Sequence, residues 1–200
     1  MTCLRRLSIP LLTLLLPAIK AQTSLQLWEI TRLTTSGMPY RSESACHDPL
    51  NTIAVEIHDP NTYPILTPGS LNLTTSETQT TQCIAKFPYC SPLYNQPFNC
   101  TDASHGRWSF TFFPTDERTD TAFWNPGQNF TLSIRFVFSG SESESESESG
   151  SGVEKGVLYT GQASFSVWEN LRGLCSAGGV CSFSLREEAV PVLVRQREVV

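Results

Sequence analysis

Polar and apolar residues alternate with a period of two along much of the chain. The longest such run, "NFTLSIRFVF", sets five apolar residues on one side: Phe130, Leu132, Ile134, Phe136 and Phe138. Two shorter runs do the same, with Ile53, Val55 and Ile57 in one and Trp108, Phe110 and Phe112 in the other. Because successive side chains of a strand point to opposite faces, each run predicts a strand with one buried face.

Shorter segments with the same alternation complete the predicted fold. They predict further strands at 25–33, 71–75, 80–85, 157–168 and 190–194. About eight strands, most with one polar face, predict an all-β chain that forms a single antiparallel β-barrel or sandwich. The sequence also has 13 prolines, many of them in expected loops, which leaves little room for helix.

One segment alternates without any apolar residue. It is "SGSESESESESGSG" at 139–152, and it offers nothing to a core that could offset the entropy of ordering it. We interpret it as a disordered, low-complexity loop between two strands, whose loss the fold should tolerate. The alternative is a phosphorylatable or cation-binding acidic tract, which without a preformed cage would bind calcium weakly.

The first 21 residues resemble a secretory signal peptide. Two arginines precede an apolar run at 7–16, and Pro17 and Ala21 follow it. We expect cleavage after Ala21, with Ala18 as the second choice. The run is far shorter than the roughly 20 residues of a membrane span, which disfavours the alternative of a signal anchor. The sequence therefore predicts a single secreted β domain at 22–200, extracellular and without a membrane partner once the signal is removed.

Removal of the signal makes the chain more acidic. Three basic residues leave with it, so the formal charge falls from −5 for the full chain to −8. The remaining sequence has no cluster of lysine and arginine. Since binding to nucleic acid depends on neutralising phosphates with cations, we expect no nucleic-acid partner.

The cysteines predict disulfides. Cys3 leaves with the signal, and six remain: Cys46, Cys83, Cys90, Cys100, Cys175 and Cys181. An even number in an exported chain is typical of a disulfide framework, and the paired CxxC spacing of zinc or redox sites is absent. Cys175 and Cys181 flank Ser-Ala-Gly-Gly-Val, so we interpret this pair as a staple across a turn.

Three sequons offer candidate glycosylation sites at Asn72, Asn99 and Asn129. Asn72 and Asn129 alternate with the apolar residues of predicted strands, so both should point to solvent. Asn99 is the weaker candidate, because a disulfide at the adjacent Cys100 would compete with the transferase.

Candidate catalytic residues are few. Two "HDP" tripeptides, beginning at His47 and His58, could together bind zinc or manganese, but Asp-Pro after a strand is ordinary turn chemistry. There is no GxSxG nucleophile elbow, and His105 has no evident acid partner. We therefore name no catalytic residue and expect neither a metal nor a cofactor.

Several motifs resemble, in order, the fungal secreted proteins typified by the Alternaria major allergen. They are "LWEITRL", "TQC" at Cys83, "FNC" followed by "GRWSFTF", "VLYTGQASFSVW" and the loop "CSAGGVC". The resemblance spans roughly 25–194. It implies an antiparallel β-barrel, and an allergen or an effector that modulates plant defence, with no settled enzymatic activity.

The resemblance also implies two disulfides, Cys83 with Cys100 and Cys175 with Cys181. The chain departs from the family pattern in having Cys46 and Cys90, a proline-rich insertion before Cys100, and the Ser-Glu tract. By elimination, Cys46 would pair with Cys90. That pairing puts in doubt the family's dimerisation through an early free cysteine, although a homodimer stays open.

Two classes of function follow from the sequence. The favoured class is a secreted, allergen-like or effector-like glycoprotein that binds an extracellular host protein or a cell-wall component without catalysis. The alternative is a small secreted hydrolase whose site the sequence does not reveal. A pocket with two or more ionisable groups within hydrogen-bond reach would favour the hydrolase, and a tightly packed apolar interior would favour the binding protein.

Overall fold

The computed structural model describes residues 25–38, 50–66, 73–88, 93–101, 106–115, 127–139 and 156–199. The expected signal peptide and nearly all of the Ser-Glu tract lie outside these ranges. In the described part the only helical element is a 3₁₀ turn at Glu187–Ala189. The prediction of an all-β chain is therefore confirmed.

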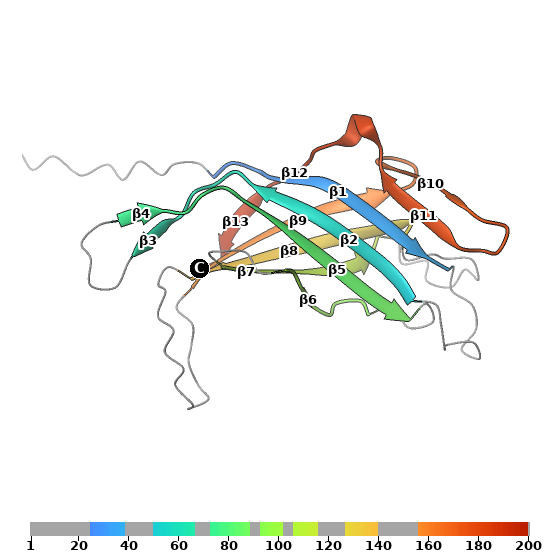
Figure 1. Cartoon of the computed structure of the whole chain (residues 1–200), viewed down its shortest axis with the longest axis horizontal. Coiled ribbons are helices and arrows are strands. Elements are labelled where there is room, and N and C mark those ends of the chain that lie inside the picture. The colour runs from blue at the N-terminus through green and yellow to red at the C-terminus, as the bar shows by residue number, and fades with distance from the viewer. Residues whose placement is uncertain are drawn as a thin grey trace, which may run out of the picture.

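Two antiparallel sheets account for most of the strands (Figure 1). The first has the order β10-β11-β1-β2-β5, with the short strand β12 also paired to β1. Its strands are β1 (Trp28–Gly37), β2 (Leu50–Asp59), β5 (Gln79–Pro88), β10 (Leu171–Cys175), β11 (Cys181–Leu185) and β12 (Val192–Val194). We call this the β1 sheet.

The second sheet has the order β13-β9-β8-β7-β6. Its strands are β6 (Phe98–Asn99), β7 (Gly106–Pro114), β8 (Asn129–Phe138), β9 (Val157–Ser166) and β13 (Gln196–Val199). We call this the β8 sheet. A separate two-stranded ribbon joins β3 (Pro64–Leu66) to β4 (Leu73–Thr75).

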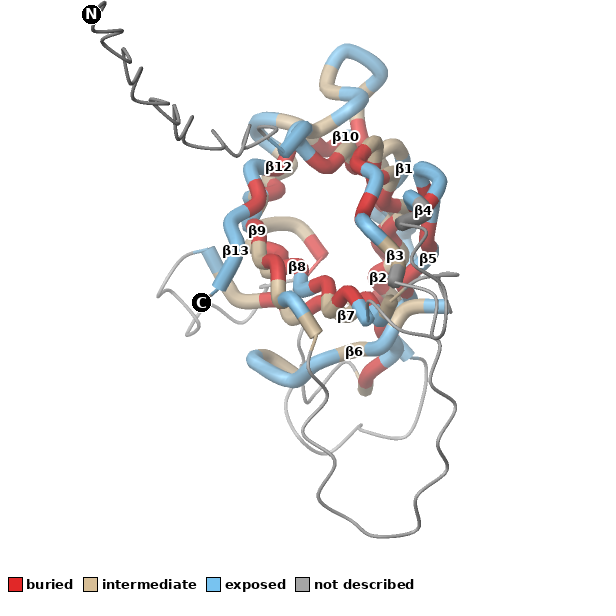
Figure 2. The backbone as a smooth tube through the Cα atoms, turned by 90° about the vertical axis from the view of Figure 1, so that its left-hand side faces the viewer, coloured by how far each residue is buried: buried red, intermediate tan, exposed pale blue. Residues whose placement is uncertain are grey.

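The core lies between the two sheets, and the period of two determines which residues enter it. All five apolar residues of the "NFTLSIRFVF" run are buried, as are the aligned apolar residues of β2 and β7. Buried segments of the two sheets face each other when the strands are viewed end-on (Figure 2). Aromatic rings fill much of this interior. Trp108, for example, stacks on Phe136 with ring centroids 4.5 Å apart and meets the Trp28 ring at 4.9 Å.

The sheets are joined at two corners, but their ladders do not form one closed ring. At one corner β12 pairs with β1, and the following strand β13 pairs with β9. Gly161 of β9 makes room for this corner, because a Cβ atom there would lie 2.7 Å from Val194. At the other corner the Cys83–Cys100 disulfide links β5 to the end of β6. Of the two predicted architectures, the structure is a sandwich.

A bulge in β1 changes which residues point inward. Ile30 pairs with Ile57 but Arg32 pairs with Glu56, so Thr31 is the extra residue. Before the bulge the even-numbered Trp28 and Ile30 are buried, and after it the odd-numbered positions are. A bulge of this kind lets one strand keep a buried face on both sides of an irregularity.

All eight predicted strands are present: β8 has the predicted ends, and the others begin or end a few residues away from the prediction. Five strands were not predicted: β3, β6, β10, β11 and β13. Each is five residues or shorter, and none has a long alternating apolar run. The sequence count of about eight was therefore too low for the part of the chain that the structure describes.

Candidate functional site

The outer face of the β1 sheet carries a groove formed by short side chains. Thr34 of β1 lies opposite Ala54 of β2 on one side and Ser184 of β11 on the other. Because all three side chains are small, the outer surface of the sheet is recessed at these positions. The hollow between β1, β11 and β10 has a volume of about 520 Å³, and its outward-facing lining includes Ser36, Ser182 and Leu174. We call it the serine groove.

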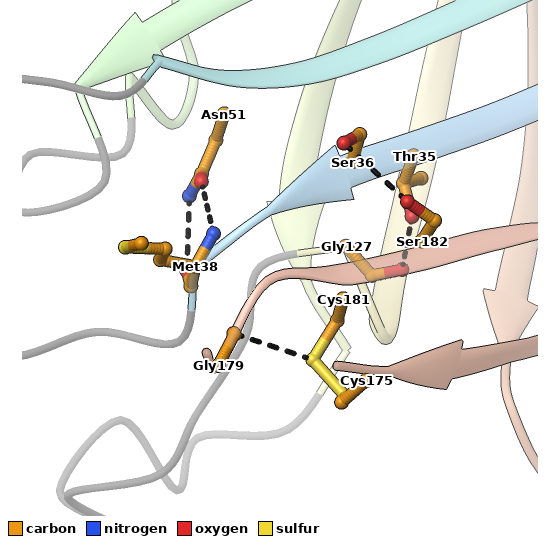
Figure 3. Close-up of a disulfide and its surroundings, with 9 residues drawn as sticks. All are labelled: Thr35, Ser36, Met38, Asn51, Gly127, Cys175, Gly179, Cys181 and Ser182. Atoms are coloured by element: carbon orange, nitrogen blue, oxygen red, sulfur yellow. Dashed lines mark hydrogen bonds between the residues drawn. A yellow bond between two sulfur atoms is a disulfide. The ribbon is translucent and has the colours of Figure 1, made fainter. Parts of the chain in front are cut away.

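The serine groove ends near the staple that joins β10 to β11 (Figure 3). Cys175 and Cys181 are disulfide-bonded, and the hydroxyl groups of Ser182 and Ser36 lie 3.5 Å apart on neighbouring strands. Leu174 is 85% exposed, an unusual degree for a leucine in a strand. The groove therefore combines hydroxyl groups with one projecting apolar side chain and with the guanidinium group of Arg172.

A smaller depression of about 150 Å³ adjoins the groove at Thr34. Arg32 and Glu56 line it from neighbouring strands. Both carboxylate oxygens of Glu56 are already held, because the Thr31 hydroxyl donates to one at 2.8 Å and the Gln82 amide donates to the other at 3.2 Å.

The chemistry available in these two hollows is limited. Glu56 is the only carboxylate among the described residues that line them, and neither hollow is lined by a histidine. An arginine side chain has only N–H donors and no acceptor, so it cannot serve as a general base. The hollows thus offer a ligand hydrogen bonds and one side chain of each charge, but no pair of groups suited to general acid and base catalysis.

A buried polar cluster lies at the end of β2, inside the sandwich. Asp59 is fully buried and accepts three hydrogen bonds: from the Asn61 amide nitrogens at 2.9 and 2.6 Å, and from the Tyr63 hydroxyl at 2.8 Å. The bond from the Asn61 backbone is the turn chemistry expected after this strand. Asn61 in turn bonds the backbone of Gln26, so the cluster ties the loop after β2 to the segment before β1.

The cluster also affects the ionisation of tyrosine. Burial, and then the neighbouring Asp59, raise the pKa of Tyr63 well above its ordinary value of 10. Burial likewise raises the pKa of Tyr159, with smaller contributions from Glu198 and Asp59. Both tyrosines therefore prefer the neutral form in the folded state.

We expect the fold to lose stability above about pH 10 because of these tyrosines. Below that pH, folded and unfolded chains hold the same phenolic protons. Above it, unfolded tyrosine releases its proton while buried Tyr63 keeps it, so unfolding is favoured by up to about 1.4 kcal/mol per pH unit for each such group. Urea midpoints between pH 8.5 and 11 should fall more gently in Tyr63→Phe than in the wild type. Parallel curves for the two proteins would contradict this assignment.

The structure does not bring His58 and Asp59 together. Asp59 points into the core, whereas His58 lies on the outer face, with its Nδ1 3.1 Å from the Thr80 hydroxyl. One ion could not take both side chains as ligands. Within the described ranges there is no group of three or more metal-ligating side chains, and His47 and His105 lie outside those ranges.

The described part of the chain contains two disulfides, and their pairs are those that the resemblance implied. Cys83 is joined to Cys100, and Cys175 to Cys181. The first bridge is supported by the Thr101 amide, which donates to the Gln82 carbonyl at 2.8 Å. Disulfides form and persist in oxidising compartments, so the chain folds in an oxidising environment. Cys46 and Cys90 lie outside the described residues, and their pairing stays a prediction.

The structure places two of the three sequons. Asn129 is on the outer face of β8, opposite in direction to buried Phe130, but it is half-buried rather than exposed. Asn99 is exposed and directly precedes disulfide-bonded Cys100. Asn72 lies outside the described residues. Glycosylation of all three stays a prediction.

Comparison with known proteins adds no relative. No protein-family model, no curated protein and no solved structure matches the chain. None of the helical segments that the structure describes is long and apolar enough to span a membrane.

Proposed function

We propose that the chain is a secreted, non-catalytic binding protein. In this proposal it is allergen-like or effector-like, as the fungal resemblance of its sequence suggests, and it acts on an extracellular host protein or a cell-wall component. The serine groove and the adjoining depression form its binding surface. The expected signal peptide and the two disulfides support export.

The observation that carries this proposal is the lining of the two hollows. Hydroxyl groups, exposed Leu174 and the Arg32–Glu56 pair can hold a ligand by hydrogen bonds, an apolar contact and charge. The one carboxylate already accepts two hydrogen bonds from its neighbours. The densely aromatic interior also favours binding at the surface rather than within the sandwich.

A substitution that fills the groove tests the proposal. Thr34 lines both hollows, and its cross-strand neighbours are small, so the ring in Thr34→Tyr can lie over the groove without disturbing the core. Tyrosine is also a good strand former. We expect immobilised mature protein to retain a partner from host apoplastic fluid or wall extract, and Thr34→Tyr to lose most of that binding.

The control is Thr80→Tyr, an equal change at an exposed position of the same sheet that lines neither hollow. It should bind like the wild type. Equal binding by all three proteins would remove the groove from the proposal. Release of sugars, acids or peptides by the wild type, lost in Glu56→Gln, would replace the binding protein with the alternative hydrolase.

A further inference from the structure

The outer face of the β8 sheet, which lies across the core from the serine groove, carries an unusual set of charges. Arg107, Arg135 and Arg197 project from β7, β8 and β13, and all three are exposed. Arg195 is also exposed, at the corner just before β13. We call the surface formed by Arg107, Arg135 and Arg197 the arginine face.

The pairing register fixes how these side chains are arranged. Arg135 and Arg197 both lie opposite Thr160, on its two sides. With neighbouring strands about 4.8 Å apart, their Cα atoms are separated by roughly 10 Å. Arg107 pairs with Val137, which places it diagonally next to Arg135. The cations therefore form a spaced array rather than a single cluster.

No carboxylate shares this face among the described residues. The outward positions around the arginines carry hydroxyl or amide groups at Asn99, Ser109, Thr111, Ser133, Thr160 and Gln162, and apolar groups at Val137, Leu158 and Val199. Arg135 and Arg197 make no hydrogen bond or ion pair with another described residue. On the β1 sheet, by contrast, Arg172 bonds Glu187 at 2.8 Å.

Arg135 and Arg197 have no ion-pair partner among the described residues, which leaves both free to bind an anion from outside the chain. The sequence pI is about 5.2, so carboxylates are plentiful elsewhere in the chain. Guanidinium groups bind carboxylates with two parallel hydrogen bonds, and short hydroxyl and amide side chains can bond sugar hydroxyl groups. The spacing of Arg135 and Arg197 suits a polymer with repeated charges better than one small anion.

We propose that the arginine face binds a polyuronate, a polysaccharide whose sugar units carry carboxylates. The sugar carboxylates bond Arg135 and Arg197, and a sugar hydroxyl group bonds the hydroxyl of Thr160, which lies between them. This site is on the opposite sheet from the serine groove and does not depend on the function proposed for that groove.

Binding of polygalacturonate to the mature protein tests this site. At low salt we expect Arg135→Gln and Arg197→Gln each to weaken binding by about tenfold, as for a hydrogen bond to a charged group, and the double variant to weaken it further. Binding should also weaken as salt screens the charges. Both residues are exposed, so thermal unfolding should stay unchanged and show that the variants are folded.

The matched control is Lys86→Gln, which removes one positive charge from an exposed position on the outer face of the β1 sheet that lines neither hollow. It should bind polygalacturonate like the wild type, and fully methyl-esterified polygalacturonate should not bind. An equal loss in Lys86→Gln would show general charge attraction and overturn the site. Tighter binding to anionic lipid vesicles or to a sulfated polymer, with the same dependence on Arg135, would overturn the polyuronate assignment.

Discussion

Replacement of Ile134 by aspartate is expected to destabilise the sandwich by more than about 3 kcal/mol. Ile134 is fully buried in β8, the middle strand of its sheet, between Phe110 and Gly161 on the neighbouring strands. A carboxylate there would lose its water and find no charged partner. The neighbouring Ser133→Asp should cost under about 0.5 kcal/mol, because Ser133 lies on the outer face between Thr111 and Gln162.

Secreted yield and urea midpoints of the two variants measure this contrast. It depends only on the alternation of faces along β8, since adjacent residues of a helix would not be separated so completely. If Ser133→Asp were as damaging as Ile134→Asp, the register of β8 would be wrong, and the arginine face would lose its basis as well.

The second large effect is expected at Asp59. Asp59→Leu keeps a side chain of similar size but removes the acceptor of three hydrogen bonds, leaving two amide donors of Asn61 and the Tyr63 hydroxyl without it. A buried donor without a partner costs about 1–3 kcal/mol, so we expect a total loss of more than about 3 kcal/mol. Asp59→Asn retains one carbonyl acceptor and should cost clearly less.

A double-mutant cycle with Tyr63→Phe separates this loss from a loss of packing. The hydroxyl is absent in Tyr63→Phe, so Asp59→Leu should cost about 1–2 kcal/mol less in that background than in the wild type. Guanidinium or urea unfolding of the four proteins gives the coupling energy. Additive effects would mean that the Tyr63–Asp59 bond contributes little to stability.

Local alternation was enough to predict the long strands. In β2, β7 and β8 each apolar residue that the alternation placed on one face is buried. An antiparallel strand with one solvent-exposed face has this period of two in its sequence. The same rule predicted only the first part of β1, to residue 33. At Thr31 the bulge reverses the alternation, so the second half of the strand no longer continues the pattern of the first.

Strands whose stability comes from their neighbours left no such signal. β13 has the sequence Gln-Arg-Glu-Val, and its only buried residue is Gln196. It forms because it continues from β12 and pairs with β9. In β10 only Leu171 is buried, and the glycine and the exposed leucine of this strand resemble a turn sequence. These strands form because they pair with segments that are distant in the sequence. A single sequence does not show which segments pair.

The candidate sites were hidden for the same reason. Thr34, Ala54 and Ser184 are unremarkable polar or small residues in their own strands, and they form a groove only because the register places them side by side. Arg135 and Arg197 lie far apart in the sequence and meet across Thr160. The Cys175–Cys181 bridge, by contrast, was predicted from the glycine-containing turn between the two cysteines, and the family resemblance implied the Cys83–Cys100 bridge.

The position of β1 in its sheet has a consequence for the nascent chain on the ribosome. β1 is the first of the described strands to be synthesised, yet on one side its partners are β11 and β12, among the last. Until residues 181–194 emerge, one edge of β1 has no native neighbour, and an open edge can pair with other chains. Long-range pairing of this kind also slows folding. Intermolecular strand pairing is therefore most dangerous before translation ends, and a chaperone that covers β1 during that interval would protect the chain most.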